Sequence, residues 1–414
     1  MDNIEEGPKK KKSYKKIILK GFGLILIILI SFTLGNIAMQ HGFILGKDSQ
    51  KYKEFMIAAD EYPEYGKLLE VRRQIGKLYV GEINEEDLVN GAAKGMTNAL
   101  NDPYTVFMTT EEYEKYIEDN SGEFIGIGVY VTSKDNNVVV SGLIEGGNAE
   151  KAGIQTGDII SSVDNEEING DLDKAVSLIT GKEIKTLSID IVRNGENINI
   201  SVDRGKVETV AAKGEMINDD IGYIILKNFD MKSSEQFIDN VKKLQSEGMK
   251  GLIIDLRENG GGYLNQAINI GSMFIPKGET ITYTLDKNNK KEVYSSSGKN
   301  SIDIPLVVLI DGYSASASEV LTGALRDYGL AETVGTTSYG KGVVQSIFKL
   351  EDGIGGLKIT TSKYYTPNGE NINKTGITPD YEVELPKEIL NEEYSKEKDV
   401  QLQKALQVME DKIK

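Results

Sequence analysis

Three serines alternate along the segment Asp311–Glu319, whose sequence is DGYSASASE: they are Ser314, Ser316 and Ser318. The segment joins an apolar run predicted as a buried strand to a predicted helix, and active sites of open α/β sheets lie beyond the carboxyl ends of strands. A hydroxyl at a helix N-terminus lies beside free amides that can stabilise an oxyanion. Ser316 and Glu319 also fit the S-x-x-E capping box, which alone would explain both residues. The segment therefore predicts a nucleophile, a helix cap, or both.

A serine nucleophile needs a base, and the composition restricts which base is available. The chain has one histidine, His41, and no cysteine. Thiol proteases, disulfides and cysteine-ligated zinc are therefore excluded, and a single histidine cannot build a histidine-rich metal site. His41 follows a long apolar segment, which is a poor position for a Ser–His–Asp triad. A hydrolase with this sequence must use a carboxylate or a lysine as its base.

Lys341 is the candidate lysine, and it lies in the segment 335–342, GTTSYGKG. This segment nearly matches the phosphate-binding pattern G-x-x-x-x-G-K-[ST], but it fails at the last position and precedes a predicted strand instead of a helix. Glycines on both sides of Lys341 favour close packing, and burial lowers the pKa of a lysine. A neutral lysine can take the proton from a serine hydroxyl, and Gln345 could orient its amine. A solvated surface lysine is the alternative.

Two glycine-rich segments could present backbone amides. Gly260, Gly261 and Gly262 follow a predicted buried strand and suit either half of an oxyanion hole or a flexible turn. The segment FIGIGV precedes another strand and could capture the C-terminal carboxylate of a peptide that adds as an extra strand. Its candidate residues are Phe124, Ile125, Gly126, Ile127 and Gly128. The apolar face of a following helix would line the peptide groove or simply pack in a core, and its residues are Leu172, Ala175, Val176 and Ile179.

The elements around these residues are predicted from apolar periodicity. Spacings of three and four indicate helices over Tyr52–Tyr79 and Glu85–Leu100, and Thr110 looks like the cap of a further helix. Short strands with an Asn194-Gly195 hairpin signal indicate a small, partly open β-barrel. Apolar strands that alternate with helices indicate a buried, largely parallel sheet. The predicted regions are helical (40–118), β-barrel (119–207), α/β (208–385) and C-terminal helical (386–414).

The first 40 residues predict how the chain is oriented. Gly21–Met39 is an uncharged stretch rich in Leu, Ile and Phe, and as a helix it would span about 28 Å of the roughly 30 Å hydrocarbon core. The basic tail 1–20 predicts a cytoplasmic N-terminus. A cleaved signal peptide is the alternative, although no clear A-x-A site follows. Either way the remainder would lie outside the cytoplasm, and the net charge of −16 argues against nucleic acid as a partner.

Seven segments within residues 47–408 together resemble the carboxy-terminal processing peptidases, a family of Ser–Lys proteases with an inserted PDZ domain. They are NDPYTVFMTTEEY, FIGIGV, AEKAGIQTGDII, DLRENGGGYL, SASASE, YGKGVVQ, and SKYYTPNGENI followed by GITPD. The resemblance implies a nucleophile (Ser316), a general base (Lys341), a residue that orients the base (Gln345), and oxyanion-hole amides (Ala317 with Gly261 or Gly262). One departure is Gly260, where many members have proline; it should make the turn more mobile without removing the amides.

The resemblance also implies protein substrates with apolar C-terminal tails, docking of these tails on the PDZ domain, and assembly through terminal helices. We therefore expect an α/β and β multidomain protein: an N-terminal transmembrane helix, a helical segment, a PDZ-type partly open β-barrel, an α/β protease core with βαβ units, and a C-terminal helix. The expected function is that of a membrane-anchored serine endopeptidase without metal, nucleotide or other cofactor. The alternatives are a catalytically inactive peptide-binding anchor and a nucleotide hydrolase that uses the 335–342 loop.

Overall fold

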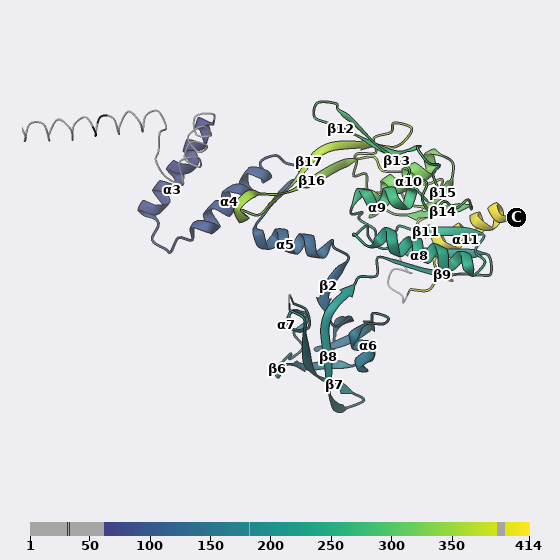
Figure 1. Cartoon of the computed structure of the whole chain (residues 1–414), viewed down its shortest axis with the longest axis horizontal. Coiled ribbons are helices and arrows are strands. Elements are labelled where there is room, and N and C mark those ends of the chain that lie inside the picture. Colours follow the sequence, from purple (N-terminus) through teal and green to yellow (C-terminus); the bar gives the residue numbers. More distant parts are fainter. Residues whose placement is uncertain (1–30, 32, 34–61, 182, 387–393) are drawn as a thin grey trace, which may run out of the picture. The chain divides into compact units, whose positions relative to one another are not determined.

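The computed structural model describes residues 31, 33, 62–181, 183–386 and 394–414 (Figure 1). The predicted membrane segment 21–39 lies outside this part of the chain apart from two positions, and so does His41. Within the described residues, no helix is both long enough and apolar enough to cross a membrane. The chain divides into two compact units, residues 1–88 and 89–414.

The first unit is helical where it is described. A short 3₁₀ turn, η1 (Pro63–Tyr65), leads into helix α3 (Gly66–Leu78). Helix α4 (Glu85–Asn98) begins within this unit, and three acidic residues in its first turn suit the positive end of the helix dipole. The predicted helix over Glu85–Leu100 is confirmed.

The region predicted as helical also contains a strand that the sequence analysis missed. Strand β1 (Val106–Met108) pairs antiparallel with β17 (Gly356–Tyr365), far along the chain. Three apolar residues are too few to show a period, so only the distant partner defines this strand. Helix α5 (Thr110–Asp119) follows, and its cap is Thr109, whose hydroxyl accepts the Glu112 N–H at 3.2 Å. The predicted cap at Thr110 was therefore wrong by one residue.

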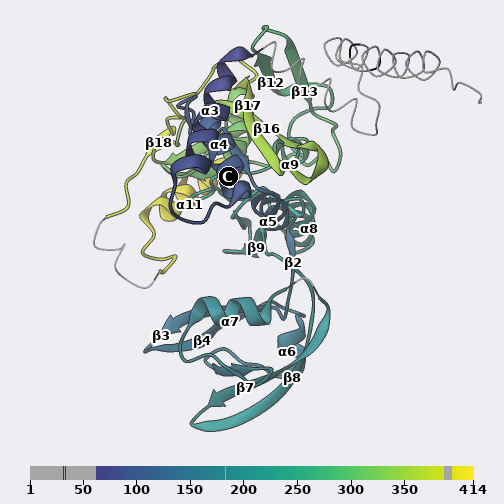
Figure 2. The same cartoon turned by 90° about the vertical axis from the view of Figure 1, so that its left-hand side faces the viewer.

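Residues 123–208 form a seven-stranded sheet with two short helices (Figure 2). The elements are β2 (Glu123–Gly126), β3 (Val129–Lys134), β4 (Asn137–Leu143), α6 (Asn148–Ala152), β5 (Ile159–Val163), β6 (Glu166–Glu167), α7 (Leu172–Ile179), β7 (Lys185–Arg193) and β8 (Glu196–Glu208). The hairpin between β7 and β8 turns at Asn194 and Gly195, whose φ angles of 53° and 85° are those of the predicted type I′ turn. The short strands predicted for this region are present, and β2 and β6 are additional.

A six-stranded sheet forms the centre of the remaining part, in the order β18-β15-β14-β11-β10-β9. Its strands are β9 (Ala212–Met216), β10 (Ile221–Leu226), β11 (Gly251–Asp255), β14 (Leu306–Ile310), β15 (Ala331–Gly335) and β18 (Tyr381–Glu382). All neighbouring pairs are parallel except β9 with β10. The predicted buried, largely parallel sheet is confirmed.

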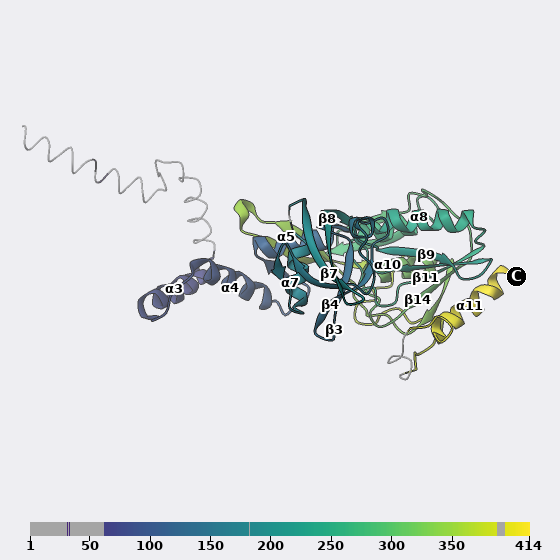
Figure 3. The same cartoon turned by 90° about the horizontal axis from the view of Figure 1, so that it is seen from below.

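Helices cover both faces of this sheet, which explains its fully apolar strands. Helices α8 (Ser233–Ser246), α9 (Leu264–Gly271) and α10 (Ala317–Asp327) contribute to one core cluster. Helix α11 (Val400–Ile413) packs on the opposite face, beside β14 and β11 (Figure 3). Alternate residues of β14 divide between the two cores, with Val308 toward α10 and Val307 toward α11.

A second, antiparallel sheet was not predicted, and it contributes one wall of the site described below. Its strands are β1, β12 (Thr280–Asp286), β13 (Lys291–Ser295), β16 (Val343–Lys349) and β17, in the order β1-β17-β12-β13 with β16 also paired to β17. The turn η2 (Glu351–Gly353) connects β16 to β17. Strand β16 confirms the strand predicted after Lys341.

Candidate active site

Ser316 occupies the turn between β14 and α10 in a strained backbone conformation. Its φ of 58° and ψ of −112° lie in a region that residues with a side chain rarely adopt, at a cost of about 1–3 kcal/mol. Hydrogen bonds hold it there: its N–H donates to Glu319 Oε2 at 2.8 Å, and its carbonyl accepts from the Val320 N–H at 2.9 Å. The bond to Glu319 is the return half of the predicted capping box.

The structure distinguishes the roles of the three alternating serines, which could not be distinguished from their spacing. The buried Ser314 hydroxyl donates to the Leu256 carbonyl at 2.7 Å, and the buried Ser318 hydroxyl donates to the Asn259 carbonyl at 2.9 Å. Both hydroxyls therefore stabilise the fold. Ser316 is half-buried and lines a cavity of about 300 Å³.

Lys341 lines the same cavity and has an unusually acidic ammonium group. Burial lowers the pKa of Lys341 to about 8; the positive charge of Lys358 acts in the same direction, and the carboxylates of Glu319 and Asp102 oppose it. At pH 7 roughly a tenth of such an amine is neutral, compared with less than a thousandth of an ordinary lysine. The Nζ atom lies 4.6 Å from the centre of the Tyr104 ring. Lys341 is therefore suited to accept a proton near neutral pH.

Close packing around Lys341 was predicted from its flanking glycines. A Cβ atom added at Gly340 would lie 2.8 Å from the Gly376 backbone nitrogen, and one added at Gly342 would lie 2.6 Å from that of Asn373. These contacts confirm the close packing. The nucleotide-loop alternative is wrong, because the segment leads into strand β16 and not into a helix.

One buried carboxylate connects the backbones of Ser316 and Lys341. Glu319 is fully buried in the first turn of α10 and accepts hydrogen bonds from five donors. They are the Ser338 hydroxyl (2.6 Å), the Gly340 N–H (2.7 Å), the Ser316 N–H (2.8 Å), the Lys341 N–H (2.9 Å) and, more weakly, the Tyr364 hydroxyl (3.5 Å). The capping-box pattern predicts only the bond from the Ser316 N–H, and the other four donors were not predicted.

Gln345 lies on β16 and also lines the cavity. Its side-chain amide donates to the Thr360 hydroxyl at 3.2 Å across the β16–β17 pair. Within the described residues we find no hydrogen bond between Gln345 and Lys341. The Gln345 side chain is thus held by a residue of β17, and it lines the same cavity as Lys341, the residue that it was predicted to orient.

The glycine turn after β11 offers one engaged amide and one open amide. The Gly261 N–H donates to Asn259 Oδ1 at 2.9 Å, so it is not available to a ligand. The N–H groups of Gly262 and Ala317 have no hydrogen-bond partner within the described residues, and both residues line the cavity with Ser316. Of the two glycines that the sequence left open, the geometry favours Gly262.

Gly261 instead allows the glycine turn to approach the segment that carries Ser316, which we call the serine loop. Its φ is +97°, and a Cβ atom there would lie 2.6 Å from the Ala315 carbonyl oxygen and 2.9 Å from Ser316 Cβ. No residue other than glycine fits this conformation and this spacing. The Ala315 N–H donates to the Asn259 carbonyl at 3.0 Å, which ties the same two segments together.

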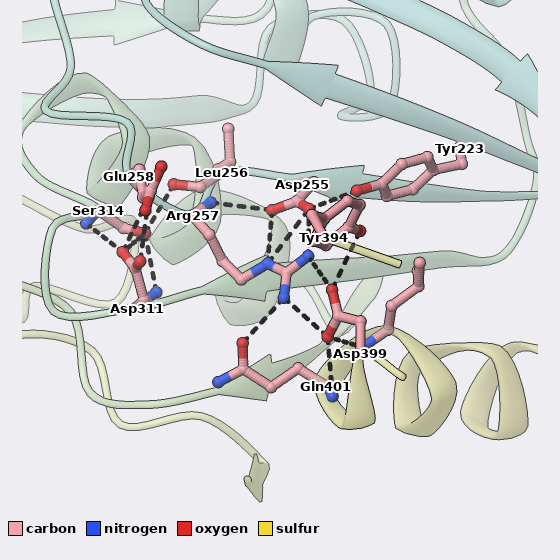
Figure 4. Close-up of polar contacts among 11 residues, drawn as sticks. Tyr223, Asp255, Leu256, Arg257, Glu258, Asp311, Ser314, Tyr394, Asp399 and Gln401 are labelled. Carbon is pink, nitrogen blue, oxygen red and sulfur yellow. Dashed lines mark hydrogen bonds and ion pairs between the residues drawn. The ribbon is translucent and has the colours of Figure 1, made fainter. Parts of the chain in front are cut away.

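Asp311 and Arg257 hold the glycine turn and the serine loop in place through further polar contacts (Figure 4). The Asp311 carboxylate accepts the Glu258 N–H at 3.1 Å and the Ser314 N–H at 3.0 Å. The guanidinium of Arg257, largely buried, pairs with Asp255 at 2.6 Å.

The same guanidinium reaches the cap of helix α11. It pairs with Asp399 at 2.8 Å and donates to Gln401 Oε1 at 3.0 Å. Burial would by itself lower the pKa of Arg257, but the two carboxylates raise it above the usual value. The C-terminal helix is therefore joined to the segment that begins the glycine turn, a contact that no sequence pattern indicated.

Several cavity residues had no role in the sequence analysis. Tyr116 and Asn120 come from the end of α5, Lys358 and Tyr364 come from β17, and Tyr263 follows the glycine turn. Tyr364 lies in the SKYYTPNGENI segment, whose motif was recognised without a role for its members. The signal was present in the sequence, but only the unpredicted sheet brings Lys358 and Tyr364 to Ser316.

The residues predicted to bind a peptide tail divide into two groups. Phe124, Ile125 and Val176 line a cavity between the small β domain and helix α5, and its remaining lining is mostly polar and includes five acidic residues, four of them on α5. The others on the same segments are internal: Ile127, Ala175 and Ile179 are buried in the domain core, and Leu172 packs against it. Gly126 ends β2, and Gly128 has a φ of +84° at the turn into β3.

Three family comparisons match separate parts of the chain. Residues 220–383 match Peptidase family S41, residues 139–193 match the PDZ domain, and residues 36–112 match the Activating protease CtpB N-terminal domain. The carboxy-terminal processing protease CtpA of Bacillus subtilis (strain 168) is 34% identical over 365 residues, which are 88% of this chain and 77% of that protein. The chain belongs to peptidase family S41.

A second sequence relative agrees. A probable CtpA-like serine protease of Staphylococcus haemolyticus (strain JCSC1435) is 32% identical over 93% of this chain and 77% of its own length. Among solved structures, the photosystem II D1 C-terminal processing protease is 29% identical, covers 77% of this chain and 88% of its own, and has a TM-score of 0.46. This member of family S41 is a serine protease of the CtpA-like kind, with a PDZ domain, and its fold is a mixed α/β multidomain one.

Proposed function

We propose that Ser316 is the nucleophile of this protease and that Lys341 is its general base. The observation that carries this proposal is that Ser316 and a half-buried lysine with a lowered pKa line one cavity. Neutral Lys341 takes the hydroxyl proton while Ser316 Oγ attacks the peptide carbonyl carbon. The protonated amine then gives its proton to the leaving nitrogen, and a water activated by the same amine releases the acyl group.

The oxyanion of the tetrahedral intermediate binds to the N–H groups of Ala317 and Gly262. Both are unpaired within the described residues and line the cavity, and each donor of this kind is worth about 3–4 kcal/mol in the transition state. Gln345 orients the Lys341 amine as substrate enters. Its anchoring to Thr360 supports this role because it limits the directions that the amide can adopt.

The substrates are proteins with apolar C-terminal tails, which the PDZ domain holds while Ser316 cleaves near the tail. The names of the CtpA relatives support processing at carboxyl termini. The Phe124–Gly128 segment captures the terminal carboxylate, and Phe124, Ile125 and Val176 supply apolar contacts in their cavity.

The location is the cell membrane, with residues 21–39 as a single-pass anchor, the N-terminus in the cytoplasm and the protease outside it. The length and apolar composition of this segment and the lysines before it support the proposal. Copies of the chain associate through terminal helices, as the family resemblance implies.

The test is cleavage of a protein that ends in an apolar tail, with the full chain in detergent micelles. Ser316→Ala and Lys341→Ala should each abolish cleavage while tail binding persists, because neither residue belongs to the PDZ domain. A parent that binds tails without cutting them would support the inactive peptide-binding anchor instead. Retention of half the activity by Lys341→Ala would refute the base assignment, and equal cleavage of a C-terminally amidated substrate would refute carboxylate capture.

A further inference from the structure

The active-site cavity contains a second lysine that the proposed reaction does not use. Lys358 lines the cavity together with Lys341, and it is more than half buried. None of the described residues that line this cavity is acidic. A buried cation without an acid beside it is unusual, because desolvation of a charge is costly unless a partner compensates it.

The register of the second sheet fixes where Lys358 lies. In the β16–β17 pair, Lys358 is opposite Ile347 and Thr360 is opposite Gln345. Directly opposed residues share a face of a sheet, and residues two apart on a strand share a face as well. Lys358 therefore projects from the same face as Gln345, the face that forms a wall of the cavity.

The surroundings of Lys358 provide little compensation for its charge. Its Nζ atom lies 5.1 Å from the centre of the Tyr116 ring, a cation–π contact from α5. In the described part of the chain no ion pair includes Lys358, and burial alone lowers its pKa. The carboxylates of Glu319 and Asp102 act on Lys341, and neither is among the groups that shift the pKa of Lys358.

We propose that Lys358 is a positioning residue for Lys341: its ammonium group, held in the same cavity without a carboxylate, keeps the Lys341 amine in its neutral, proton-accepting form. The inference rests on the proposed role of Lys341 as general base. Repulsion between two ammonium groups in a cavity of low dielectric favours the state in which one of them has lost its proton.

The other charged and titratable groups around Lys341 act in the opposite direction or stay neutral. Glu319 on α10 and Asp102 before β1 both favour the charged form of Lys341. Burial raises the pKa of Tyr104 to about 12 and raises that of Tyr364 well above its ordinary value, so both phenols are neutral in the working range. Tyr116 on α5 also has a pKa raised by burial. Among the charged groups, Lys358 is thus the one that acts together with burial against the two carboxylates.

The test measures how fast Ser316 reacts with a fluorophosphonate probe between pH 6 and 10.5, with the full chain in detergent micelles. This reaction requires the serine and its base but no peptide tail. In the parent, the rate should rise with pH through a midpoint near 8, the pKa of Lys341. Lys358→Met and Lys358→Gln remove the charge and should move the midpoint up by about one pH unit, as expected for a unit charge lost at an effective dielectric constant near 20.

The charge-retaining control is Lys358→Arg, which should keep the parent midpoint because arginine stays protonated. At pH 7 the two neutral variants should react about tenfold more slowly than the parent, and at the alkaline plateau they should match it within about twofold. Unchanged midpoints in both neutral variants would overturn the proposal. A lower plateau with the parent midpoint in the neutral variants would also overturn it, because that result would indicate that Lys358 contacts the reacting group. A midpoint shift in Lys358→Arg equal to that in Lys358→Met would overturn it as well.

The two neutral variants differ in shape, so a folding defect in one leaves the other to decide, and a thermal melt of each identifies the defect. Lys341→Ala separates this inference from the proposed function. If that variant still reacts at the parent rate, the base assignment fails. If it is inert while the Lys358 variants titrate like the parent, only the role of Lys358 fails.

Discussion

Glu319→Gln is the substitution whose cost the structure defines most closely. The two carboxylate oxygens accept from five donors, and glutamine must replace one oxygen by an NH₂ group. If the NH₂ replaces Oε2, it faces the N–H groups of Ser316 and Lys341, which lie 2.8 and 2.9 Å away. If it replaces Oε1, it faces the Gly340 N–H, while the Ser338 hydroxyl can rotate to accept from it.

The second arrangement is therefore the cheaper one, and it leaves one buried backbone N–H without an acceptor. Such a group costs about 1–3 kcal/mol, so we expect the free energy of unfolding to fall by this amount. Chemical denaturation measures it directly. The exposed Glu235 on α8 provides a matched control, and Glu235→Gln should change the free energy by less than about 0.5 kcal/mol.

The same substitution should change the pH dependence of cleavage. The Glu319 carboxylate raises the pKa of Lys341, so its loss should move the acid limb of kcat/KM to lower pH, even though the displaced backbones of Ser316 and Lys341 lower the plateau. An unfolding free energy equal to that of the parent, together with an unmoved acid limb, would refute the assignment of Glu319 as the link between nucleophile and base.

Three further outcomes follow from other contacts. Because Lys341 must be neutral to act, kcat/KM of the parent should rise with pH through about 8, and a profile already flat at pH 6 would contradict this. Gly261→Ala should abolish cleavage, because its Cβ would lie within 3 Å of the serine loop, whereas Gly260→Ala, with no atom within 4 Å of its Cβ, should keep nearly full activity. Asp399→Asn keeps a cap for α11 but removes one charged partner of the buried Arg257. The free energy of unfolding at neutral pH should therefore fall by up to about 3 kcal/mol, as chemical denaturation would measure. An unchanged free energy of unfolding would show that the ion pair contributes nothing to stability.

The parallel sheet and the β hairpin could be predicted because their signals are local. Continuous apolar strands such as 306–310 are typical of strands buried on both faces, and Asn194-Gly195 determines its turn by conformation alone. The importance of Ser316 and Lys341 came from recognised motifs. Their spacing by itself left Ser314 and Ser318 equally plausible, and only the hydrogen bonds of those two hydroxyls distinguish them.

The antiparallel sheet could not be predicted, because its strands gain their identity from distant partners. Val106–Met108 is too short to show a period, and its partner lies about 250 residues away. The place of Lys358 and Tyr364 in the cavity depends on this sheet, so it was missed with it. The sequence predicted only one of the five donors to Glu319, because a capping box is a local pattern and the donors at 338–341 and 364 are not.

The contact between Arg257 and the cap of α11 has a consequence for how such an enzyme is made. The strand that leads to the glycine turn is made well before helix α11, and its arginine gains Asp399 and Gln401 only after 142 and 144 more residues have been added. A growing chain would thus lack these two anchors until translation had reached the first turn of α11. The segment before the glycine turn would reach its final stability only late in synthesis.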